Sequence, residues 1–170
     1  MGCLFGIRTV PRCSRGDKRP WRRLSGYPRP VPLTTVLRAV HVFSNVVWIG
    51  SILSVALLVG RARFMADGAE VGGLARRVYT HLAVPAFLGS FVFGLTQFVM
   101  GIGAYAHVPW MHAKLTLALG IIALHHIIGA RAKRAAAGHA KSSGGTTGLM
   151  VALLVCAAGV VWLAVAKQLP

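Results

Sequence analysis

The sequence predicts an all-α membrane protein, a bundle of four transmembrane helices. Of its 170 residues, 55% are hydrophobic, and the mean hydropathy is +0.64. It has 19 Lys and Arg but three acidic residues, so the formal net charge is +16. A soluble nucleic-acid-binding protein would combine such charge with ordinary hydropathy, and a disordered chain would have fewer apolar residues. The two properties together indicate basic loops around membrane helices and no nucleic-acid partner.

Four long apolar stretches give the elements in order. A helix needs roughly 20 mostly apolar residues to cross a bilayer. These stretches are continuously apolar and do not alternate as β-barrel strands do, so we expect helices. The predicted helices cover residues 34–60, 79–103, 108–130 and 148–168.

The loops predict the topology. Loops 61–78 and 131–147 each hold four Lys or Arg, whereas the link 101–109 holds none. By the positive-inside rule the two basic loops face the cytoplasm, and both termini then lie outside.

The first 33 residues form a separate basic tail, and residues 34–170 form the membrane domain. The tail has eight basic residues and one acid, which conflicts with an outside N-terminus. Three explanations stay open: an upstream start codon that is not used in the cell, a juxtamembrane segment that contacts anionic lipid, or an organellar transit peptide. The three cysteines have no metal-type spacing and predict no zinc or iron–sulfur site.

Polar residues inside membrane helices are candidate functional sites, because burying them is costly. On the first helix, spacings of three, four and three put four such residues on one face: Arg38, His41, Asn45 and Trp48. The third helix carries His112, Lys114, His125 and His126.

The first and third helices run in the same direction, so His41 and Lys114, both early in their helices, lie near the same membrane surface. His81 and His125 lie toward the other surface. The predicted helices contain no acidic residue, so Lys114 has no carboxylate partner within them. It is either a neutral amine that ligates a metal, or a cation that pairs with an anionic group such as a porphyrin propionate, or a side chain that reaches the interface. His41 is either a haem ligand or a histidine hydrogen-bonded between helices.

Three segments resemble the haem-dependent membrane protoporphyrinogen IX oxidases, within the copper-resistance protein D-like superfamily. They are LRAVH at 37–41 followed by WIG at 48–50, RRVY at 76–79, and WMHAKL at 110–115 followed by His125 or His126. The resemblance covers about residues 34–134.

The resemblance implies one haem b per chain with His41 and Lys114 as its axial metal ligands, and a site that also includes Arg38, Trp48, His112 and His125. The implied reaction is the six-electron oxidation of protoporphyrinogen IX to protoporphyrin IX, with electrons passing to a membrane acceptor such as a quinone. The implied location is the bacterial cytoplasmic membrane. No catalytic residue is assigned.

Two departures from the family keep other functions open. The Pro-Arg segment that usually follows the first Trp-x-x-Gly is missing, and so are the polar residues that usually open the fourth helix. One alternative is a copper-handling protein that uses Met100, His107, Met111 and His112. Another is an electron carrier without porphyrinogen activity, with a second haem between His81 and His125. Small residues such as Gly89, Gly94 and Ala157 suggest that the chain associates with other copies of itself.

Overall fold

The computed structural model describes residues 32–140 and 144–166, which belong to the second of two compact units, Val31–Pro170. The described residues form helices and no strand, which confirms the predicted all-α class. The basic tail lies outside the described residues except for its last two. In chain order the elements are α1 (Leu33–Ala62), α2 (Gly68–Val78), the π-helical turn η1 (Tyr79–Ala83), α3 (Val84–Met100), the short α4 (Ile102–Tyr105), α5 (Pro109–Ala136) and α6 (Thr146–Ala166).

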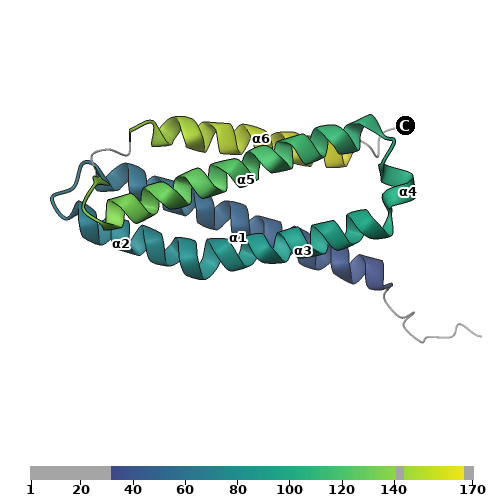
Figure 1. Cartoon of the computed structure of the whole chain (residues 1–170), viewed down its shortest axis with the longest axis horizontal. Helices are drawn as coiled ribbons and strands as arrows, with labels where there is room; N and C mark the ends of the chain where they lie inside the picture. The colour runs from purple at the N-terminus through teal and green to yellow at the C-terminus, as the bar shows by residue number, and fades with distance from the viewer. Residues whose placement is uncertain (1–31, 141–143, 167–170) are drawn as a thin grey trace, which may run out of the picture. The chain divides into compact units, whose positions relative to one another are not determined.

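Four helices are long and apolar enough to cross a membrane, with α2, η1 and α3 joined into one continuous span. Figure 1 shows α1 and α5 running in one direction, and the joined span and α6 running in the other. The chain is therefore a multi-pass membrane protein, as predicted.

The predicted start of the second helix, residue 79, is wrong by eleven residues, because the helix begins at Gly68. Its first three turns are amphipathic: Gly68, Gly72 and Ala75 are buried at helical spacing, while the other face is polar. A search for continuous apolar residues misses such turns. Most of loop 61–78 is therefore helical, and Glu70 is an acidic residue inside a helix, contrary to the prediction that there is none.

The other boundaries differ less. α1 covers 33–62 instead of 34–60, and α5 continues six residues past 130. Basic loop 131–147 is therefore shorter than predicted. α6 begins at Thr146 rather than 148, and its predicted last two residues lie outside the described part of the chain.

Helix α1 is the centre of the bundle, because it packs against α2, α3, α5 and α6. Its buried face repeats at helical spacing through Trp48, Ile52, Val55, Ala56 and Val59. Among the described elements, α3 packs mainly on α1, whereas α5 packs on α2 and α6. The joined second span thus packs on both α5 and α1 at its start and mainly on α1 over the rest of its length.

Small residues let the helices approach closely at two crossings. A Cβ added to Gly72 would lie 2.4 Å from the carbonyl carbon of Ala135, so α2 and α5 nearly touch there. At the α1–α3 crossing, a Cβ added to Gly89 would lie 3.1 Å from Ser44 Oγ. A Cβ added to Gly94 would lie 2.6 Å from His41 Cε1. Gly89 and Gly94 therefore serve packing within the chain.

Helix α6 is mostly uncovered by the protein. Of its residues only Thr146 and Leu153 are buried, and side chains such as Val155 and Trp162 are more than 60% exposed. An apolar helix with this exposure is suited to contact with lipid.

The Gly72 crossing gives a test of the fold. Gly72→Ala should lower the free energy of unfolding by roughly 1–3 kcal/mol, because the new methyl group collides with the α5 backbone. Gly73→Ala is the matched control: an added Cβ has no neighbour within 4 Å there, and removing a helical glycine should raise stability by roughly 0.5–1 kcal/mol. Thermal unfolding in detergent measures both, and equal effects of the two substitutions would contradict the packing.

Candidate functional site

His41 lies half-buried on α1, facing α3, with both ring nitrogens hydrogen-bonded. Its Nδ1 is 2.9 Å from the carbonyl oxygen of Ser90. A carbonyl can only accept, so Nδ1 carries the proton and Nε2 has the lone pair. Nε2 accepts a hydrogen bond from Asn45 Nδ2 at 3.1 Å. The surrounding chain therefore fixes one tautomer, in which Nε2 is the basic nitrogen.

Asn45 and Ser90 complete this network. Ser90 Oγ donates to Asn45 Oδ1 at 2.9 Å, and Asn45 Nδ2 also donates to the backbone carbonyl of His41 at 2.9 Å. One turn further along α3, Gly94 leaves the space that the imidazole occupies. The ring is thus held between α1 and α3 by a hydrogen bond to the α3 backbone and by close contact.

Lys114 lies half-buried near the start of α5, close enough to His41 to act on it electrostatically. Figure 1 shows that α1 and α5 run in the same direction. By residue number, His41 and Lys114 each belong to the first third of their helix. The structure therefore brings an imidazole and a primary amine near one another at one end of the bundle.

Two further candidates lie outside this arrangement. Arg38 is exposed one turn before His41. His112 is also exposed, and its Nδ1 lies 3.2 Å from the backbone carbonyl oxygen of Val108. Neither side chain contacts His41 through a hydrogen bond in the described structure.

Trp48 and His125 form a second cluster in the middle of the bundle, joined by a hydrogen bond. Trp48 shares a helical face with His41, but its Nε1–H donates to His125 Nδ1 at 3.1 Å. His81, expected toward the same membrane surface as His125, is exposed, whereas His125 is 1% exposed. Sequence spacing predicts a shared face but not which neighbouring helix that face meets.

Aromatic rings surround His125. The rings of Tyr79 and Phe87 stack on it at centroid distances of 4.9 and 5.0 Å, both with planes 29° apart. Tyr79 reaches this position from the π-helical turn, over Gly129, where a Cβ would lie 2.2 Å from the tyrosine ring. Because Nδ1 accepts from Trp48, Nε2 carries the proton, and it is buried with no partner in the described structure. His125 is therefore an oriented donor in an apolar environment.

Sequence reasoning missed Ser90, Tyr79 and Phe87 as partners of the histidines. Ser90 had a signal, because it and Gln97 are two polar residues seven positions apart on one face of an apolar helix. Gln97 also lies at the α1–α3 contact, donating to the carbonyl of Leu37 at 3.2 Å. Tyr79 and Phe87 had no such spacing signal, because apolar residues occupy every face of the helix.

The residues proposed for copper differ in exposure. Met111 is buried, whereas Met100, His107 and His112 are exposed. Across residues 32–140 and 144–166, no three His, Cys, Asp or Glu side chains come close enough to hold a metal ion together.

The Trp48–His125 bond can be tested by a double-mutant cycle. Trp48→Phe should lower the free energy of unfolding by about 1–2 kcal/mol, because it leaves both nitrogens of a buried imidazole unpaired. In a His125→Phe background the same substitution should have a smaller effect. Unfolding in detergent measures the cycle, with the exposed Trp162→Phe as control. Equal effects of Trp48→Phe in the two backgrounds would contradict the hydrogen bond.

Comparison with models of protein families, with curated proteins and with solved structures finds no match. The chemistry of the two histidine clusters is therefore the basis on which a function can be assigned.

Proposed function

We propose that this chain is a membrane haem-b oxidoreductase that oxidises protoporphyrinogen IX to protoporphyrin IX, and that His41 and Lys114 would hold one haem. The observation that carries the proposal is the state of His41. Its Nδ1–H is anchored on the Ser90 carbonyl, so Nε2 is the nitrogen that can bind a metal. Metal-ligating histidines usually donate their other N–H in this way.

The donor set fits haem iron. Haem needs two axial donors rather than a cluster of three or more side chains, and a buried imidazole is a common one. Lys114 offers an amine from α5 within electrostatic reach of His41, and an amine in a low-dielectric site can ligate as the neutral form. If Nε2 bound a metal, Asn45 would lose its hydrogen bond to Nε2 and keep the one that it makes with the His41 carbonyl.

The other side chains have supporting roles. A bound haem supplies one-electron chemistry, through which electrons pass from the porphyrinogen to a membrane quinone. Arg38, exposed one turn before His41, is suited to pair with a propionate of the haem or of the substrate, because a guanidinium group matches a carboxylate in shape and charge. Gly94 keeps the imidazole close to α3, which limits its rotation.

The proposal includes a location in the bacterial cytoplasmic membrane. Five basic side chains lie where α1 and α5 end: Arg61, Arg63, Arg131, Lys133 and Arg134. Two more, Arg76 and Arg77, lie in the last turn of α2, beside the end of α5. The positive-inside rule assigns this end to the cytoplasm. His41 and Lys114 then lie toward the outer side of the membrane.

Haem content tests the ligands. Purified protein should show a Soret band and about one haem b per chain. His41→Ala and Lys114→Met should lose the haem or shift its spectrum strongly, because each removes an axial donor. His107→Ala and Lys133→Met are the controls, since both change exposed side chains of the same types. Colourless wild-type protein, or unchanged haem in His41→Ala, would contradict the proposal.

Activity needs a separate test. The gene should restore growth of a bacterial strain that lacks protoporphyrinogen oxidase, and the His41→Ala gene should not. Membranes from the rescued strain should convert protoporphyrinogen IX to fluorescent protoporphyrin IX in the presence of quinone. Haem-containing protein that fails to rescue would identify a haem-binding electron carrier without porphyrinogen activity.

A further inference from the structure

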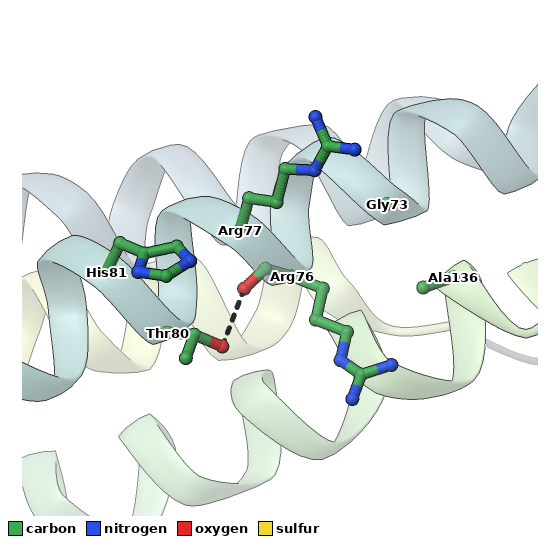
Figure 2. Close-up of a pocket in the computed structure, with 6 residues that line it drawn as sticks. All are labelled: Gly73, Arg76, Arg77, Thr80, His81 and Ala136. Atoms are coloured by element: carbon green, nitrogen blue, oxygen red, sulfur yellow. Dashed lines mark hydrogen bonds between the residues drawn. The ribbon is translucent and has the colours of Figure 1, made fainter.

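A basic groove lies at the opposite end of the bundle from His41. It is formed between the α2–η1 segment and the end of α5, and its volume is about 410 Å³. Six residues line it, as Figure 2 shows: Gly73, Arg76, Arg77, Thr80, His81 and Ala136. Neither histidine cluster uses these residues.

The sequence builds the groove from one helical face. The five lining residues of α2 and η1 follow spacings of three, one, three and one, which places them on one broad face of the helix, with Arg76 at the edge toward α5. The close approach of Gly72 to Ala135 fixes this segment against α5. Gly73, the next residue, has no side chain, and an added Cβ there would have no neighbour within 4 Å. The groove is therefore open where Gly73 lies.

The donors around the groove point to an anion. Figure 2 shows Arg76 extending toward α5 and Arg77 leaving the same turn in the opposite direction, with His81 one turn further along. Thr80 is less available as a donor to an anion, because its hydroxyl already donates to the Arg76 carbonyl at 3.0 Å. Two guanidinium groups and an imidazole remain, and each guanidinium group can donate two parallel N–H bonds to phosphate oxygens.

Within the described part of the chain, the side chains of Arg76, Arg77 and His81 have no ion-pair or hydrogen-bond partner. The nearest carboxylate in the sequence, Glu70, is exposed and precedes Arg76 by six residues, which is roughly 9 Å along a helix. The chain as a whole carries a net charge of +16. The balancing negative charge must therefore come from outside these residues.

The position of the groove decides the source of that charge. Toward the membrane centre, the turns that follow His81 expose apolar side chains, with Leu82 at 51% and Leu88 at 53%. A basic groove above an exposed apolar surface matches a molecule with an anionic head and hydrocarbon tails. Inorganic phosphate would bind only the basic groove and would make no use of the exposed apolar surface.

We propose that this groove binds the phosphate headgroup of an anionic phospholipid, whose acyl chains lie along the exposed side of α3. The site is independent of the haem proposal, because it lies at the other end of the bundle and shares none of its residues.

Lipid binding by the full-length protein in detergent tests the proposal. Delipidated protein is titrated with phosphatidylglycerol or phosphatidylcholine, and native mass spectrometry measures the bound lipid. The double variant Arg76→Gln/Arg77→Gln should bind phosphatidylglycerol roughly twentyfold more weakly, since each basic residue near an anionic headgroup strengthens binding about fivefold. The control Lys133→Gln/Arg134→Gln removes the same charge from exposed residues outside the groove and should bind nearly as the wild type does.

A second variant separates shape from charge. Gly73→Phe places a ring in the groove and leaves the charge unchanged, so it should also weaken phosphatidylglycerol binding while phosphatidylcholine binding stays weak and equal. Size-exclusion chromatography and helical circular dichroism check that each variant folds. Equal weakening in the groove and control doubles would overturn the proposal, because it would show a diffuse charge effect. Inorganic phosphate that displaces the lipid at similar concentrations would overturn the assignment to a lipid.

Discussion

Hydrocarbon offers no hydrogen-bond partners, so each polar side chain inside this bundle needs a partner within the chain or in a bound molecule. The near absence of acidic residues makes the constraint more severe, because imidazole, amine and indole groups must then be satisfied by amides, hydroxyls and backbone carbonyls. His41 meets the constraint with Asn45 and the Ser90 carbonyl. His125 meets half of it with Trp48 and leaves Nε2 without a partner in the described structure. The packing of α1 against its neighbours is arranged around these two imidazoles.

Close helix contact makes these hydrogen bonds and ring contacts possible. His41 reaches the α3 backbone because Gly94 has no side chain, and Tyr79 reaches His125 because Gly129 has none. The functional arrangement therefore depends on residues that carry no chemistry of their own. The two clusters also differ in kind. The nitrogen with the lone pair at His41 is suited to a metal, whereas the buried Nε2–H of His125 is suited only to an acceptor atom.

The sequence was sufficient to predict the class and number of the helices, because hydropathy and length determine which segments can cross a bilayer. It also predicted that α1 and α5 run in the same direction, so that His41 and Lys114 lie near one end. It did not predict that Trp48 turns to His125, since several helices can meet one face and spacing within a helix does not choose among them. The first turns of α2 were also missed. Their buried residues are Gly68, Gly72 and Ala75, whose small side chains add little to the hydropathy of the segment.

The π-helical turn at Tyr79–Ala83 joins α2, which packs on both α5 and α1, to α3, which packs mainly on α1. A π turn accommodates one residue more than the α-helix around it, and each α-helical residue advances the helix by about 100°. That extra residue sets the rotation of α3 relative to α2. Without it, the surface that holds Ser90 and Gly94 would turn away from His41 while Gly72 stayed against α5. The turn thus sets the rotation of one continuous helix so that α2 faces α5 and α3 faces α1.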